Sequence, residues 1–137
     1  MITSAEQFVA LRESELKDEY DRAAMDEAPL AVWRDIISRY PEHRRWVVHN
    51  KSVPLEILEE LSAGDAMVRY FIASKRKLSP ALFERLSRDE SESVRTAIAC
   101  NAKTPRAILE RLLDDADQSV ARAALYHWEQ KGGKLRK

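Results

Sequence analysis

The stretch that decides the fold runs from Val94 to Asp115 and reads VRTAIACNAKTPRAILERLLDD. Weaker versions of it precede it at 68–89 and 47–65. Within each version, apolar residues recur at the spacing of one face of an α-helix. A motif that returns with a period of 20–50 residues is typical of proteins built from stacked repeats. The sequence therefore predicts a chain of short helical repeats.

Each repeat contains a turn residue that we call its anchor, and positions at equal distance from the anchors form a column. The anchors are Pro29, Pro54, Ser79 and Pro105, spaced by 25, 25 and 26 residues. Apolar residues fill the columns three, four and seven residues after the anchors. The columns seven, eight and eleven residues before the anchors are also mostly apolar. The predicted core columns after the anchors are Val32, Ile57, Leu82, Ile108; Trp33, Leu58, Phe83, Leu109; and Ile36, Leu61, Leu86, Leu112.

This period is short for two helices of average length, about 11–12 residues each, plus two turns. We therefore expect the longer helix after each anchor and a short helix before it, in part 3-10. The chain has only three glycines and five prolines, and helix-forming residue types dominate it. We predict an all-α fold, a short α-solenoid of helix–turn–short-helix repeats.

The predicted organisation is one domain over residues 1–129, followed by a disordered tail at 130–137. Within the domain we expect a cap and degenerate first copy at 1–28, core repeats at 29–119 and a terminal cap helix at 120–129. Thr3 or Ser4 is expected to cap the first helix, with Glu6 or Gln7 completing a capping box. Ser79 and Thr104 are expected to cap later helices.

Composition narrows the function classes. Lys plus Arg and Asp plus Glu both number 23, so the formal net charge is zero and no overall basicity favours nucleic acid or anionic membranes. The N-terminus lacks a secretory signal pattern, and no apolar run reaches the roughly 18–20 residues of a membrane span. Together with a single cysteine, these features predict a soluble, cytoplasmic protein without a membrane partner. We also expect the protein to be a monomer.

The pattern V-R-x-x-I-A-x-N-x-x-T-P-x-x-x-L-x-x-L-x-x-D at residues 94–115 resembles the leucine-rich repeat variant, which is related in style to HEAT-type α-solenoids. The resemblance covers roughly residues 43–125. It implies alternating α and short 3-10-like helices in a right-handed superhelix. Some members of that family carry an iron–sulfur cluster on a cysteine-rich segment. This chain has one cysteine and no such segment, so we expect no cofactor.

Arginines form a column ten residues before the anchors. Acidic residues lie shortly upstream of two of them. One interpretation is a ladder that ties neighbouring repeats together, and the other is a row of cations facing phosphates or acidic peptides. We favour the structural ladder, whose members are Arg44, Arg69, Arg95, Asp65 and Asp89.

A second set of residues is the predicted partner-binding surface. Basic residues gather in the turns before the anchors and acidic residues in the turns after the following helices. Compensation of helix dipoles explains the same distribution. Exposed tyrosine and arginine are typical of protein interfaces. The predicted binding residues are Arg45, His49, Tyr70, Lys75, Arg76 and Lys77.

Catalytic and metal-binding residues are not predicted. Cys100 and His49 share a column but stand two repeats apart, about 20 Å by helix-layer spacing, and Cys100 is expected to be a small buried apolar group. We therefore predict a non-enzymatic, protein-binding repeat scaffold, an adaptor or inhibitor, whose partner has acidic character. The alternative is a nucleic-acid-binding module that uses the basic edge at Lys75 to Lys77.

Overall fold

The structure is a computed structural model that describes residues 1–134. Helix accounts for 66% of the chain, and the described residues contain no strand, which confirms the all-α prediction. None of the helices within residues 1–134 has the length and apolar character needed to cross a membrane. The chain divides into two compact units, Met1–Phe71 and Ile72–Lys137, which we call the first and second units.

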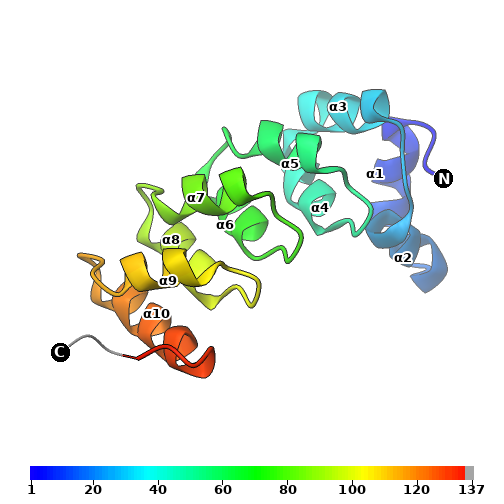
Figure 1. The fold of residues 1–137 in the computed structure, drawn as a ribbon. Coiled ribbons are helices and arrows are strands. Elements are labelled where there is room, and N and C mark those ends of the chain that lie inside the picture. The colour runs from blue at the N-terminus through cyan, green and yellow to red at the C-terminus, as the bar shows by residue number, and fades with distance from the viewer. Residues whose placement is uncertain (135–137) are drawn as a thin grey trace. The chain divides into compact units, whose positions relative to one another are not determined.

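Figure 1 labels the helices along the chain. The helix α6 (Ala66–Ala73) contains the boundary between the two units. The first unit holds α1 (Ala5–Glu13), α2 (Lys17–Met25), α3 (Leu30–Arg39), a 3-10 turn η1 (Pro41–His43), α4 (Arg44–His49) and α5 (Leu55–Leu61). The second unit holds α7 (Pro80–Ser87), α8 (Glu92–Cys100), α9 (Arg106–Leu112) and α10 (Gln118–Gln130).

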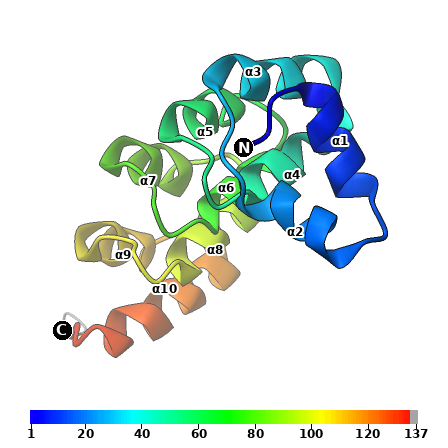
Figure 2. The ribbon, with the colours of Figure 1, turned by 90° about the vertical axis from the view of Figure 1, so that its right-hand side faces the viewer.

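Helices pack in the same way within each unit (Figure 2). In the first unit α3 lies between α1 and α5, while α2 packs on α4. In the second unit α7 packs on α9, and α8 packs on α10. Consecutive helices such as α1 and α2, or α9 and α10, also contact each other. Each unit therefore consists of stacked helical hairpins that bury their apolar stripes against their neighbours.

The predicted core columns are confirmed. Trp33 and Ile36 are completely buried in the first unit, and Leu86 and Leu109 are at most 1% exposed in the second. Burial of these side chains is the main favourable contribution to folding, at about 25 cal/mol per Å² of apolar surface. Val32, in the first column, is half-buried, and the other eleven residues of these columns are buried.

The expected difference in helix length is found at the first two anchors, where α3 and α5 have 10 and 7 residues and the preceding α2 and α4 have 9 and 6. It is wrong at the last two anchors. The helices that follow the second, third and fourth anchors have 7, 8 and 7 residues. The α6 and α8 helices, which precede anchors, have 8 and 9 residues. The repeat period is therefore met by shortening both helices of each copy. A 3-10 segment occurs once within residues 1–134, at η1, where Pro41 stands in the first turn.

Two of the expected caps are confirmed and one is wrong. The Ser4 hydroxyl accepts a hydrogen bond from the Gln7 amide at 3.0 Å, and the Gln7 side chain accepts one from the Thr3 amide at 2.7 Å. Ser79 caps α7 by accepting from the Leu82 amide at 3.2 Å. The Thr104 hydroxyl instead donates to the Ile98 carbonyl at 2.6 Å, because Thr104 lies one residue outside the cap and is completely buried.

The C-terminal helix begins at Gln118, where the Asp117 carboxylate accepts from the amide of Ser119 at 2.9 Å. After the helix, the Trp128 indole donates to the Lys134 carbonyl at 3.2 Å. A Cβ atom on Gly133 would lie 2.2 Å from the Trp128 ring, so glycine permits this close approach. The tail predicted at 130–137 overlaps this segment, and residues 135–137 lie outside the described part of the chain.

Candidate functional site

Buried asparagine side chains join neighbouring hairpins in both units. In the first unit Asn50, which is completely buried, donates from its amide to the carbonyls of Ala23 and Asp26, each at 2.9 Å. Its oxygen accepts from the amide of Ser52 at 2.7 Å. These bonds satisfy main-chain groups at the end of α2 that would otherwise be buried without a partner.

The second unit repeats this arrangement with Asn101. Its amide donates to the carbonyls of Ala73 at 2.8 Å and Lys75 at 2.6 Å, and its oxygen accepts from the Lys103 amide at 2.9 Å. Ala23 and Ala73 both stand six residues before an anchor. This role was not predicted from the sequence, although Asn50 and Asn101 share the column four residues before the anchors.

The arginine column is attached to the main chain. Arg44 donates to the Ile37 carbonyl at 2.8 Å, Arg69 to the Gly64 carbonyl at 2.6 Å, and Arg95 to the Asp89 carbonyl at 2.6 Å. All three side chains are half-buried. Each of these arginines therefore connects the start of its helix to a preceding main-chain carbonyl, and its guanidinium has a structural role.

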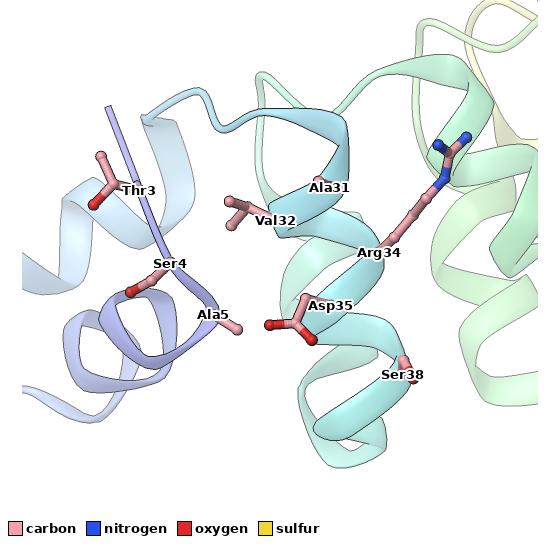
Figure 3. A pocket seen from close by; sticks show the side chains of 8 residues that line it. All are labelled: Thr3, Ser4, Ala5, Ala31, Val32, Arg34, Asp35 and Ser38. Atoms are coloured by element: carbon pink, nitrogen blue, oxygen red, sulfur yellow. The ribbon is translucent and has the colours of Figure 1, made fainter.

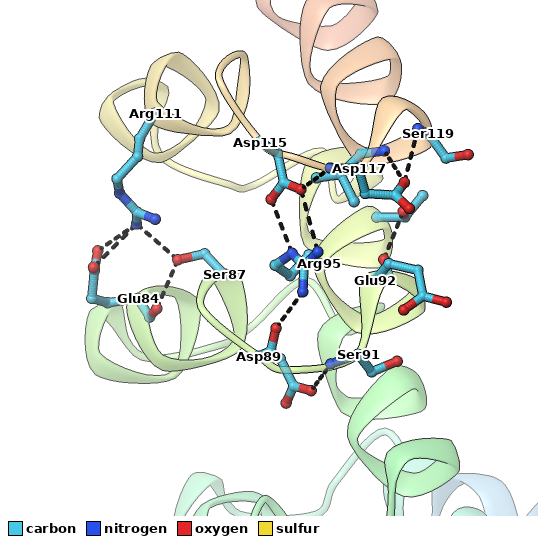
Figure 4. A network of polar contacts seen from close by, with 12 residues as sticks. Glu84, Ser87, Asp89, Ser91, Glu92, Arg95, Arg111, Asp115, Asp117 and Ser119 are labelled. Carbon is cyan, nitrogen blue, oxygen red and sulfur yellow. Dashed lines mark hydrogen bonds and ion pairs between the residues drawn. The ribbon is translucent and has the colours of Figure 1, made fainter.

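Of the predicted acidic members of the ladder, Asp65 caps the start of α6, whereas Asp89 lies in the turn before α8 and does not cap that helix. The Asp65 carboxylate accepts from the Val68 amide, and the Asp89 carboxylate accepts from the Ser91 amide, both at 2.9 Å. Arg95 forms its ion pair with Asp115, twenty residues downstream, at 2.9 Å (Figure 4). The two side chains are 18% and 9% exposed. A ladder through the whole chain stays a prediction.

Other charged side chains of the second unit pair with one another. Arg111 reaches from α9 to α7, where it contacts the Glu84 carboxylate at 3.1 Å and the Ser87 hydroxyl at 2.8 Å (Figure 4). A hydrogen bond from Arg88 and the charge of Arg111 hold the pKa of Glu84 below its ordinary value. This network stabilises the contact between α7 and α9.

Three of the predicted binding residues lie together in the first unit. Arg45 stacks on Trp46 at 4.6 Å, His49 lies between Trp46 and Phe71 with ring centroids at 5.5 and 4.8 Å, and Tyr70 contacts Phe71 at 5.6 Å. We call these five residues the aromatic face. Arg45, His49 and Tyr70 are exposed, whereas Trp46 and Phe71 are half-buried. Trp46 and Phe71 stand eight residues before their anchors, in a column predicted to be mostly apolar, and that column is therefore only partly buried.

The other three predicted binding residues belong to the second unit. Arg76 and Lys77 are exposed in the turn before α7, and Lys75 is half-buried with its carbonyl bonded to Asn101. The six predicted residues are thus divided between two compact units. Their use as one binding surface stays a prediction.

Beside the aromatic face is a cavity of about 210 Å³, which we call the Arg12 cavity. The Arg12 guanidinium lies over two rings, with its carbon 4.3 Å from the centroid of Tyr20 and 3.4 Å from that of Trp46. Its Nε atom is buried and makes no hydrogen bond. The cavity is lined by Arg12, Tyr20, Ala23, Ala24, Trp46 and His49.

A second depression lies between the start of α1 and α3 (Figure 3). Val32 points from α3 toward Ser4, whereas Arg34 points away toward α5 and pairs there with Glu60 at 3.0 Å. Asp35 is bound by Arg39, whose hydrogen bond lowers the pKa of the Asp35 carboxyl. The charged side chains of this depression are therefore already paired, whereas Arg12 is not.

The expectation for Cys100 is wrong. The residue is exposed at the end of α8, because this column faces away from the apolar stripe. Partial burial still raises the pKa of its thiol. Residues 1–134 contain no group of three or more His, Cys, Asp and Glu side chains placed to hold a metal ion.

No protein-family model, curated protein or solved structure matches this chain. The resemblance to the leucine-rich repeat variant therefore stays a prediction from the repeated residues.

Proposed function

We propose that this protein is a non-enzymatic scaffold that binds a protein partner, as an adaptor or inhibitor. The observation that carries the proposal is the aromatic face, in which exposed Arg45, His49 and Tyr70 rest on half-buried Trp46 and Phe71. Tyrosine, tryptophan and arginine dominate the binding energy of protein interfaces. Rings already held by their neighbours lose little conformational entropy when a partner binds.

The proposed architecture is a right-handed α-solenoid of the leucine-rich repeat variant style. The stacked hairpins of each unit and the anchor spacing of 25 to 26 residues support it. Solenoids use extended surfaces of this kind for binding. We further propose that the protein acts as a monomer in the cytoplasm and that its partner is acidic, since Arg12 and Arg45 lie at or beside the aromatic face.

Affinity capture from lysate of the source organism tests the proposal. The wild type should retain a specific protein, and the double variant Arg45→Ala, Tyr70→Ala should lose it. The matched control is Arg122→Ala, Tyr126→Ala, which removes an exposed arginine and an exposed tyrosine from α10. Equal loss from both double variants, or no specific protein in the wild-type capture, would contradict the assignment to the aromatic face.

The alternative function is nucleic-acid binding through Lys75, Arg76 and Lys77. The exposure of Arg76 and Lys77 favours it, and the zero net charge opposes it. A gel-shift experiment at low salt separates the two functions. Binding that weakens steeply with salt and disappears in Arg76→Ala, Lys77→Ala would support nucleic acid, whereas no shift at low salt would end this alternative.

A further inference from the structure

We propose that the Arg12 cavity receives one acidic side chain, a glutamate or aspartate, from the protein partner. The inference rests on the proposed protein-binding function and names the chemistry that the site recognises. Three properties of the cavity support it: a guanidinium without a counter-ion, two rings that hold that guanidinium in place, and a volume suited to a single side chain.

Arg12 carries a positive charge that its own protein does not neutralise. Among the described residues it makes no hydrogen bond and no ion pair, and its buried Nε is left without an acceptor. Other arginines of the first unit, such as Arg22 and Arg39, pair with nearby carboxylates. No carboxylate lines the Arg12 cavity. A desolvated donor without an acceptor is costly, so an incoming carboxylate gains more here than at a solvated arginine.

The rings of Tyr20 and Trp46 define the sign of the ligand charge. Two aromatic faces around one point are the usual arrangement for binding a cation. Here that position is already taken by Arg12, at 4.3 and 3.4 Å from the two ring centroids. A second cation would be repelled, whereas an anion would meet a guanidinium plane held in a fixed orientation. Fixed planar donors bind carboxylates through two parallel hydrogen bonds.

The size and lining of the cavity indicate one side chain. Its volume of about 210 Å³ is below the roughly 300–1,000 Å³ of pockets for drug-sized ligands. The methyl groups of Ala23 and Ala24 supply apolar wall for the methylene groups of an acidic side chain. Because the cavity adjoins the aromatic face through Trp46 and His49, a partner on that face can insert a side chain without a separate binding site.

Nuclear magnetic resonance with peptides tests the inference. The probe is a blocked peptide with a single glutamate among glycine and serine residues, and its control replaces the glutamate with glutamine. The glutamate peptide should shift the Arg12 Nε–H and the Trp46 indole N–H signals, and the glutamine peptide should shift neither. Arg12→Leu should weaken glutamate-peptide binding about tenfold or more, as expected for loss of hydrogen bonds to a charged group.

Arg122→Leu is the matched control, because Arg122 is an exposed helical arginine of the second unit. It should bind the glutamate peptide like the wild type. Arg12→Lys keeps the charge without the planar fork, and it tests the site if the leucine variant fails to fold. The Arg12→Lys variant should bind the glutamate peptide more weakly than the wild type does, but should still prefer it to the glutamine peptide.

Equal shifts from both peptides, or no shift of the Arg12 and Trp46 signals by the glutamate peptide, would overturn the inference. Unchanged binding by a folded Arg12→Leu variant would also overturn it. A partner captured through Arg45 and Tyr70 but unaffected by Arg12→Leu would leave the proposed function standing and the cavity assignment wrong. Failure to capture any protein would instead count against the proposed function itself.

Discussion

The two units solve the same packing problem but differ in what they do with their charged side chains. Asn50 in the first unit and Asn101 in the second bind main-chain carbonyls of the preceding hairpin. In the second unit Arg95 and Arg111 are bound to carboxylates of the same unit. In the first unit Arg12 lies against aromatic rings without a counter-ion. The shared asparagines show which features maintain the fold, and the difference is the reason why we propose a binding site in the first unit.

The largest expected effect tests whether the two units depend equally on their core. Leu61 in the first unit and Leu112 in the second belong to one column and are 4% and 2% exposed. Each substitution to alanine should lower the free energy of unfolding by about 2–5 kcal/mol, because it removes apolar contacts and leaves a cavity. Urea denaturation measures this change. A loss under about 0.5 kcal/mol at either position would contradict the column assignment.

Removing the asparagines is the next largest perturbation. Asn50→Ala and Asn101→Ala should each cost about 1–3 kcal/mol or more, because buried carbonyls lose their donors. Chemical denaturation gives the values, and Gln130→Ala on the exposed end of α10 is the control. Similar losses of unfolding free energy at both positions would show that the two units depend equally on their asparagines. A change as small as that of the control would mean that the asparagines are not structural determinants.

The coupling energies of ion pairs should differ between the two units, by less than the effects of the core and asparagine substitutions. A double-mutant cycle on Arg95 and Asp115 should give a coupling of about 1–2 kcal/mol, since the pair is half-buried and bidentate. The same cycle on Arg22 and Asp26 in the first unit should give less than about 1 kcal/mol, because that pair is more exposed. Equal couplings would remove this distinction between the units.

The smallest effect is expected from pH. Hydrogen bonds from arginines lower the pKa of Glu6, Asp26 and Asp35 in the first unit and of Glu84 in the second. A carboxyl group whose pKa is lower in the folded protein stabilises it above the ordinary values of 4.5 for glutamate and 3.8 for aspartate. That stabilisation is lost as the pH falls through the folded-state pKa.

Acidification from about pH 6 to pH 3 should therefore destabilise the first unit slightly more than the second. Hydrogen exchange measured by mass spectrometry separates the two, with α3 reporting on the first unit and α9 on the second. High salt should reduce the effect, because these groups are exposed to solvent. Greater loss of protection in α9 than in α3 would contradict this expectation.

The core could be predicted because each helix buries a stripe that repeats with the anchors. Leu58, Phe83 and Leu109 share one column and are all buried. Local rules also identified the Ser4 and Ser79 caps, since these depend only on nearby residues. Thr104 failed under the same rule because its hydroxyl finds a buried carbonyl six residues back, and sequence spacing does not reveal that competition.

The candidate site was less predictable because it depends on contacts between helices. Arg45, His49 and Tyr70 were identified from their columns, and the structure supplies the rings that join them. Arg12 lies in the N-terminal cap and belongs to none of the repeat columns, so it was not predicted as a site residue. Its placement requires α1, α2 and α4 to pack around a common point, which a periodic pattern does not encode.

The hydrogen bonds of the Asn101 side chain have a consequence for how such a chain can change over time. They go to the main-chain carbonyls of residues 73 and 75 and the main-chain amide of residue 103. Every amino acid supplies the carbonyls, and every one except proline supplies the amide. The preceding hairpin can therefore alter its side chains freely while the junction is preserved. Duplication or exchange of whole hairpins then needs no matched substitutions at the seam, and surfaces such as the aromatic face can diverge independently of the framework that carries them.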